Sequence, residues 1–345
     1  MRPLLNQSVK LKLAEEYPPP QEQEFLRELV AIQAKKMVRS DDGTFLRNAH
    51  SKHHACVRAE FTVDPDLPED FRVGVFKLAC TYPAILRFSN SLGMIRPDSK
   101  RDARGLAIKL LEVEGEKLLI DKQHEKAQDF MLNSHNVFVA RNVEDCLNIL
   151  NKPRLLKLLW FFFNPFDPHV RQIPIGLRLR KRIASPLDIR YWSMLPYLFG
   201  PKRAVKYSVM PCAIGSATIP RKTSDNYLRE AMQQRLANEA VHFDFMIQFQ
   251  NDPYTMPIED ATIAWDEAIS PFRKVATIKI PIQQFDSPEE LESCEHLTFN
   301  PWHSLAEHRP LGGINRARKI VYQTVSELRH QRNGVSLYDL SAHSS

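Results

Sequence analysis

The residues of this sequence best suited to chemistry are Arg318, Tyr322 and Arg329, which lie in the run ARKIVYQTVSELRH. If this run is a helix, a turn of 100° per residue places the three within about 40° of one another on one face. A nearby cation can lower a tyrosine pKa of about 10 by roughly one to three units, which favours a phenolate. A phenolate is a hard, anionic ligand for ferric iron. The alternative is an amphipathic helix with a half-buried tyrosine and solvated arginines.

A second candidate group is the segment HSKHH, in which His50, His53 and His54 stand at the spacing that brings histidines together on a helix. Such a group would suit zinc. The following residues, Ala55 to Val63, instead alternate between apolar and polar side chains, which predicts a half-buried strand. We therefore favour a strand over a zinc site.

The elements that position these groups follow from two periodicities. Helical spacing of apolar residues predicts helices at 21–37, at 224–237 after a Ser/Asp cap, and from Asn315 to Asn333-Gly334. Period-two alternation predicts strands at 55–63, 83–89, 105–113, 204–211, 242–250 and 274–282. The proline-interrupted stretch 150–200 is expected to wrap around the rest. Two groups of strands with helices between and behind them predict an α+β fold built on an antiparallel barrel.

Composition narrows the class of protein. The chain has 345 residues, of which 43% are hydrophobic and 26% charged, as in ordinary soluble proteins. Its net charge of +6 is spread along the chain, so we do not expect it to bind nucleic acid. Five widely spaced cysteines without a CxxC pair suggest neither a disulfide framework nor a zinc ribbon, and Cys56 is expected to be a packed strand cysteine. The absence of a signal-peptide core and of an 18-residue apolar run predicts a cytoplasmic protein.

Further candidates lie beside the predicted strands. Arg47 and His50 stand three residues apart, just before the strand at 55–63. The run ILRFSNSLGMIRPDSKRDARGLAIKLL carries Arg87 and Ser89, and the run QDFMLNSHNVFVARN carries Asn133.

The C-terminal run RKIVYQTVSELR adds an Arg-x-x-x-Tyr pattern. Together these four stretches resemble segments of the haem catalases, occur in the same order as in that family, and cover residues 45–330. The run FNPWHSLAEHRPLGGINRARK is similar to the small catalase-related haem proteins, the branch that includes the coral allene oxide synthase domain. The resemblance implies a catalase-like barrel with haem b between the barrel and the C-terminal helix.

It also implies roles for single residues. Tyr322 would be the proximal iron ligand, with Arg318 holding its phenolate. His50 would be the distal acid and base, oriented by a hydrogen bond from Ser89. Asn133 would position the peroxide, although Asn136 lies close enough in sequence to be an alternative.

Arg47, Arg87 and Arg329 would clamp the haem propionates, because guanidinium forks suit carboxylates. The implied function is a haem peroxidase or catalase-like oxidoreductase acting on hydrogen peroxide or an organic hydroperoxide. Two alternatives stay open: a fatty-acid hydroperoxide isomerase or lyase, and a non-catalytic haem-binding protein. Ala49 before the distal histidine is typical of catalases, whereas Phe138-Val139 leaves more room for larger hydroperoxides than the consecutive phenylalanines of catalases.

The expected organisation is an N-terminal helical arm (1–40), a haem-binding domain (41–334) and a tail (335–345), with the oligomeric state left open. Within the domain, the apolar run PRLLKLLWFFFNPF (153–166) is followed by five basic residues up to position 182. The run is too short to span a bilayer. It either covers the barrel or, with the basic residues, rests on an anionic membrane and admits lipid hydroperoxides.

Overall fold

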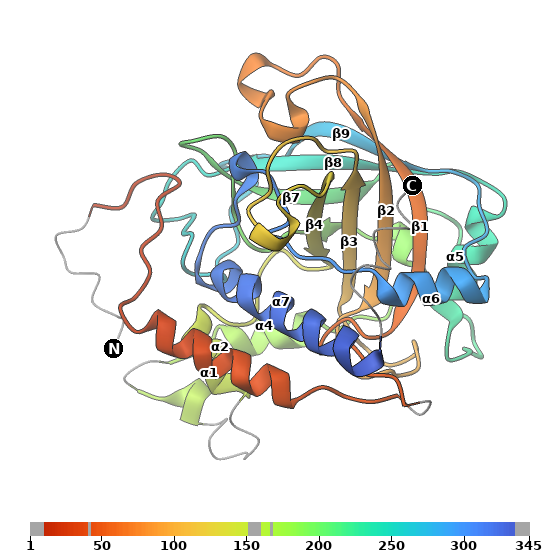
Figure 1. The fold of residues 1–345 in the computed structure, drawn as a ribbon, viewed down its shortest axis with the longest axis horizontal. Coiled ribbons are helices and arrows are strands. Elements are labelled where there is room, and N and C mark those ends of the chain that lie inside the picture. Colours follow the sequence, from red (N-terminus) through yellow and green to blue (C-terminus); the bar gives the residue numbers. More distant parts are fainter. Residues whose placement is uncertain (1–9, 41–42, 151–159, 166–167, 335–345) are drawn as a thin grey trace.

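The computed structural model describes residues 10–40, 43–150, 160–165 and 168–334. An antiparallel sheet dominates them, with neighbouring strands in the order β5-β4-β3-β2-β1-β9-β8-β7. Pairing of β5 with β7 closes this sheet into an eight-stranded barrel (Figure 1). The predicted antiparallel barrel is therefore confirmed. The strands are β1 (His53–Val63), β2 (Thr81–Asn90), β3 (Arg104–Leu111), β4 (Ala127–Asn133), β5 (Tyr191–Trp192), β7 (Ala204–Pro211), β8 (Val241–Phe249) and β9 (Arg273–Ile280), while β6 (Tyr197–Leu198) pairs with β7.

Aromatic side chains fill the barrel. Phe245 packs edge-on against Phe61 and Phe130, with ring centroids 5.1 and 5.0 Å apart, and Tyr207 packs against Phe130 at 5.0 Å. Such pairs add about 0.5–1.5 kcal/mol each to the burial of the rings themselves. Because this interior is packed with side chains, a planar cofactor would have to lie outside it.

The six strands predicted from alternation are present, with ends within two residues of the expected positions. The strand β4 was missed, because nearly all its residues are buried and polar side chains interrupt the apolar pattern. Gln128 accepts a hydrogen bond from the backbone of Leu305 at 3.0 Å, and Asp129 pairs with Lys109 at 2.6 Å. Partners on the neighbouring strand β3 and in a distant segment let polar groups occupy a buried strand.

Helices gather at one end of the barrel. In Figure 1, α1 (Glu22–Lys35), α2 (Val143–Leu150), α4 (Gln172–Arg178) and α7 (Gly313–Asn333) lie below the strands. Leu26 and Leu29 of α1 share one apolar cluster with Val143 of α2 and Ala317 of α7. The helix α7 ends at Gly334, which has a φ of +67°, so the predicted Asn333-Gly334 stop is confirmed.

The cap predicted for the helix at 224–237 is wrong. This helix, α5, spans Tyr227–Leu236, and Asn226 makes no side-chain capping bond. The Asp225 carbonyl is instead engaged by the backbone of Asp98 at 3.0 Å. The Asp98 carboxylate then accepts from the Leu228 backbone amide at 3.1 Å, so a residue far away in sequence caps the helix.

A helix that was not predicted, α6 (Pro288–His296), lies beside β1 and corrects the cysteine assignment. Cys294 at its end forms a disulfide with Cys56 of β1, 238 residues away in sequence. Cys56 does lie in a strand, as expected, but it is bonded to Cys294 and is more than a packed side chain. Cys80, Cys146 and Cys212 are free. The expected tail 335–345 and most of the apolar run 153–166 lie outside the described residues.

Candidate active site

The centre of the candidate site is a row of residues across three neighbouring strands. Ser89 of β2 lies opposite Gly105 of β3, which in turn lies opposite Asn133 of β4. His50, just before β1, places its Nδ1 atom 3.0 Å from Ser89 Oγ. A Cβ atom at Gly105 would lie 2.4 Å from the same nitrogen, so the imidazole rests directly on this glycine. Sheet register thus gathers residues separated by more than 80 positions in the sequence.

The backbone of His50 is held in a strained conformation. Its φ is +58°, in the left-handed region of backbone conformation that residues other than glycine rarely adopt. Its amide donates to the Ser91 carbonyl at 3.1 Å, and its carbonyl accepts from Arg87 Nη2 at 2.9 Å. Strain of this kind costs about 1–3 kcal/mol and concentrates at functional sites. The two hydrogen bonds show how the surroundings maintain it.

The surroundings of His50 also keep it neutral. Burial, followed by repulsion from Arg87 and Arg318, lowers the pKa of His50 to about 3. A neutral imidazole can accept a proton at neutral pH, as a general base must.

Asn133 is the better placed of the two candidate asparagines. It is buried, and its Oδ1 atom has no hydrogen-bond partner among the described residues. Asn136 is exposed. A buried polar atom without a partner is uncommon in folded proteins and suits a site that receives a ligand.

Adding a methyl group beneath His50 should specifically impair the site. In Gly105→Ala, the new Cβ would meet the imidazole at 2.4 Å and Ser89 Oγ at 2.9 Å, so the ring must move. A displacement of about 1 Å in a catalytic group can cost on the order of 10² in rate. If the site reacts with peroxide, as the resemblance implies, the rate measured by stopped-flow absorbance should fall by that order. Gly176→Ala is the control, because no atom lies within 4 Å of its added Cβ. Unchanged kinetics in Gly105→Ala would contradict the placement of His50.

The second part of the site lies on α7. Arg318 Nη2 donates to the Tyr322 hydroxyl at 3.2 Å, and the guanidinium carbon lies 5.0 Å from the centre of the tyrosine ring. Arg318 Nη1 donates to Asn315 Oδ1 at 3.3 Å. Although burial opposes it, interactions with Tyr322 and Tyr197 raise the pKa of Arg318. Arg318 therefore stays a cation beside the phenol oxygen.

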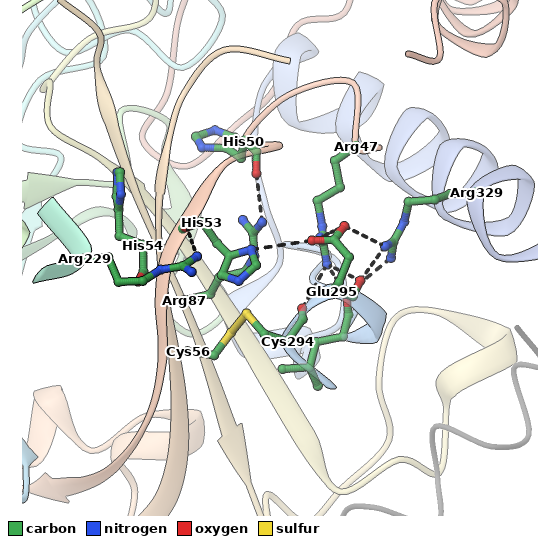
Figure 2. The surroundings of a disulfide bond; sticks show 11 residues. Arg47, His50, His53, His54, Cys56, Arg87, Arg229, Cys294, Glu295 and Arg329 are labelled. Atoms are coloured by element: carbon green, nitrogen blue, oxygen red, sulfur yellow. Dashed lines mark hydrogen bonds and ion pairs between the residues drawn. A yellow bond between two sulfur atoms is a disulfide. The ribbon is translucent and has the colours of Figure 1, made fainter. Parts of the chain in front are cut away.

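Arg329, two turns further along α7, turns toward a different partner. It forms a cluster with Arg47 and Arg87, and Glu295 of α6 lies among them (Figure 2). Arg47 Nη1 lies 2.5 Å and Arg329 Nη1 3.2 Å from Glu295 Oε1. We call these four residues the arginine cluster. The three arginines predicted to bind carboxylates are thus brought together, around a carboxylate that was not predicted.

The arginine cluster remains electropositive. Burial and then repulsion from Arg47 lower the pKa of Arg329 to about 9, and the same causes lower that of Arg87 well below its ordinary value. Although burial opposes it, Arg47 is the foremost of the groups that lower the pKa of Glu295 to about 2. Three guanidiniums and one carboxylate leave two positive charges. Since Arg87 Nε has no partner among the described residues, the cluster retains a free donor for an anion.

The other two histidines of HSKHH point to separate partners. His53 Nδ1 lies 3.6 Å from Glu295 Oε2, and His54 Nε2 lies 2.9 Å from Asn90 Oδ1. Within the described part of the chain, no three His, Cys, Asp or Glu residues gather as a metal-binding group. His53 and His54 lie in strand β1, so the helical spacing that would bring the three histidines together does not apply to them.

Two residues of the site, Gly105 and Glu295, were not predicted from the sequence. Nothing in the local sequence marks Gly105 as the residue on which the His50 imidazole rests. Glu295 was missed because α6 was missed. Its signal was present: Ser287 and Glu290 form a capping box with Pro288 at the first helical position.

Comparison with known proteins supports the fold. No protein-family model and no curated protein sequence matches the chain. Solved structures do match. A fungal catalase aligns with a TM-score of 0.68 at 16% identity, over 98% of this chain and 69% of its own. Catalase A from Saccharomyces cerevisiae aligns with a TM-score of 0.66 at 17% identity, over 97% and 71%.

A bacterial catalase gives a TM-score of 0.62 at 15% identity, over 96% of this chain and 64% of its own. Sequence identities this low support a shared fold and do not by themselves assign a function. The alignments nevertheless extend over almost the whole chain, and the strand order closes the same kind of antiparallel barrel that the sequence led us to expect. This chain has the catalase fold.

Proposed function

We propose that the protein is a haem-dependent, catalase-like oxidoreductase that reacts with hydrogen peroxide or an organic hydroperoxide. The observation that carries the proposal is the placement of His50, which is neutral, strained and hydrogen-bonded to Ser89, in the same row of the sheet as Asn133. A proton acceptor beside an amide is the pair needed to deprotonate and position a peroxide.

The residues present suit haem b. Tyr322 offers a phenol oxygen beside the Arg318 cation, as an anionic iron ligand requires. The arginine cluster carries two excess positive charges, which match the two propionates of one haem. The unpartnered Arg87 Nε is a donor for one of them. Tyr322 would thus hold the iron, and the arginine cluster would hold the rim of the ring.

When bound, the haem supplies the redox chemistry of peroxide cleavage. The chain supplies proton transfer and positioning. His50 takes the proton of the peroxide and returns it to the departing oxygen, a role worth about 10²–10⁴-fold in rate. Asn133, whose side-chain oxygen lacks a partner among the described residues, orients the peroxide beside the imidazole.

The decisive experiment is an absorption spectrum of the purified protein, recorded before and after addition of hydrogen peroxide. A haem spectrum with a tyrosinate charge-transfer band that changes on addition of peroxide is expected. A haem spectrum that stays unchanged would favour a non-catalytic haem-binding protein. Against that alternative stands the His50–Asn133 arrangement, which a carrier does not need.

A fatty-acid hydroperoxide isomerase or lyase is the second candidate. In residues 160–163, which are helical, the side chains of Trp160 and Phe163 are each 58% exposed. A hollow of about 400 Å³ lined by basic residues lies elsewhere on the surface. Exposed apolar rings and basic side chains both suit lipids. Oxygen evolution from hydrogen peroxide, compared with conversion of a fatty-acid hydroperoxide without added reductant, separates the two functions.

We also propose peripheral membrane contact through residues 153–182. This segment includes the two exposed rings and three of the four residues that line the basic hollow. The described part of the chain contains no helix with the length and apolarity needed to cross a bilayer. The basic hollow is lined by Arg101, Arg180, Lys181 and Arg182. Each basic residue near an anionic membrane adds about 1 kcal/mol, so such a group can give salt-sensitive binding.

Co-sedimentation with lipid vesicles tests this contact. The protein should pellet with anionic vesicles at low salt, less at high salt, and little with neutral vesicles. Replacing Arg180, Lys181 and Arg182 by Gln should weaken binding by about 100-fold, since three charges are lost. A variant with Gln at Arg221 and Lys222, which are also exposed, is the control. Equal sedimentation with anionic and neutral vesicles at low salt would leave segment 153–182 as a cover of the barrel.

A further inference from the structure

The C-terminal end of α6 occupies the arginine cluster with more than one group. Besides the Glu295 carboxylate, Arg47 Nη2 donates to the Glu295 carbonyl at 3.0 Å and to the Leu297 carbonyl at 2.6 Å. Arg329 also donates to the Glu295 carbonyl. These carbonyls are the unsatisfied acceptors that every helix leaves at its C-terminus, and cations stabilise that end. The end of α6 thus takes up donors of two of the three arginines.

A carboxylate ligand would need these same donors. Guanidinium forks bind carboxylates through paired N–H groups, and Glu295 already engages Arg47 and Arg329. Two carboxylates that seek one set of donors compete, and their like charges repel each other at close range. Glu295 stays ionised at neutral pH, because the arginines hold its pKa at about 2. Protonation therefore does not release it.

The disulfide holds this competitor in place. Cys294 immediately precedes Glu295, and its bond to Cys56 ties the end of α6 to β1 (Figure 2). Without that bond, α6 would be held by the noncovalent contacts of the arginine cluster and of β1. The tether acts on the residue next to the carboxylate, so cutting it changes the freedom of Glu295 more than that of any other acid on α6.

We propose that Glu295 is an internal competitor for the arginine cluster, and that the Cys56–Cys294 disulfide controls it. With the disulfide formed, Glu295 stays between Arg47 and Arg329 and weakens binding of a dianionic carboxylate ligand. With the disulfide reduced, the end of α6 can leave and the arginines become available. This regulation rests on the proposed function, in which the ligand is the pair of haem propionates.

The redox step needs a dithiol. One thiolate of the dithiol attacks the Cys56 sulfur, which is less buried than Cys294, and the sulfur–sulfur bond breaks to release the Cys294 thiolate. The second thiolate of the reagent then displaces Cys56 from the mixed disulfide. Two electrons pass to the two cysteines, each of which takes up a proton, while the reagent becomes a cyclic disulfide.

Haem titration of the full chain, followed by absorbance, tests the proposal. Wild-type protein treated with dithiothreitol should bind haem about tenfold more tightly than the oxidised protein. Glu295→Gln should bind tightly even when oxidised, and should lose most of the response to the dithiol. Glu292→Gln is the matched control: its carboxylate lies on the same helix with a side chain 76% exposed, so it should behave as wild type. Cys212→Ser, at an exposed free cysteine, controls for other thiols.

Equal haem affinity in both redox states, or weaker binding by Glu295→Gln, would overturn the proposal. Hydrogen exchange of residues 288–297 adds a measurement that needs no haem, and reduction should accelerate it in the wild type. If no state binds haem, the proposed function fails and the exchange experiment alone decides. Faster exchange then supports release of α6 by reduction, whereas equal exchange overturns it.

Discussion

The Tyr322→Phe variant is expected to fold normally and to lose the oxygen that we propose as the iron ligand. Only the hydroxyl is removed, and the structure engages that oxygen through Arg318 Nη2 at 3.2 Å. Tyr322 is only half-buried and its ring remains in phenylalanine, so the cost to the free energy of unfolding should be about 1 kcal/mol or less. Without this proposed ligand oxygen, the tyrosinate charge-transfer band and most haem retention should be lost.

The measurement is the absorption spectrum after reconstitution with haem, with circular dichroism to verify the fold. Tyr254→Phe is the matched control, since this tyrosine is 61% exposed and is not one of the residues assigned to the site. If Tyr322→Phe binds haem with an unchanged charge-transfer band, another residue holds the iron and the assignment of α7 as the proximal helix is wrong.

Much of the fold could be predicted because its signals are local. The alternation of Phe243, Phe245 and Ile247 with polar residues requires no knowledge of the strand's neighbours, and β8 appears where it was expected. The stop of α7 at Gly334 is equally local, because the left-handed conformation there suits glycine. These features depend on backbone and side-chain preferences within one segment.

The features that could not be predicted depend on partners far away in sequence. The cap of α5 is supplied by Asp98, about 130 residues earlier, so no inspection of 224–237 could find it. Cys56 and Cys294 are 238 residues apart, and five cysteines allow many pairings. The buried strand β4 tolerates Asp129 because Lys109 on the neighbouring strand and His303 in a distant segment pair with it. In each case a tertiary contact overrode the local pattern.

The site shows the same division within a single helix. Helical periodicity correctly put Arg318 on the face of Tyr322, one turn away. The same periodicity put Arg329 there as well, yet its guanidinium is drawn to Glu295 and the end of α6. Helical periodicity predicts the direction in which the Cβ atom of a residue points. The guanidinium of a long arginine side chain can still lie several ångströms away from that direction, beside a charged partner. Because the helix α6 was not predicted, Glu295 could not be identified as the partner of Arg329.

His50→Ala is expected to retain haem and to lose reaction with peroxide by a factor on the order of 10² or more. The side chain removed is the proposed proton acceptor, which is hydrogen-bonded to Ser89, whereas the proposed iron ligand and the arginine cluster stay intact. Stopped-flow absorbance of the haem after mixing with peroxide measures the rate. Substitution of His53 or His54 by Gln should matter much less, because these side chains face Glu295 and Asn90 instead.

The pH profile gives an independent check on His50, because its neutral form is the one that accepts a proton. With the pKa lowered to about 3, mainly by burial, the imidazole is neutral throughout the neutral range. The wild-type rate should therefore stay level from about pH 5 upward and fall only as the pH approaches 3, whereas a solvent-exposed histidine would lose activity below about pH 6.5. A wild-type rate that halves near pH 6.5, or equal rates for His50→Ala and wild type, would remove His50 from the role of acid and base.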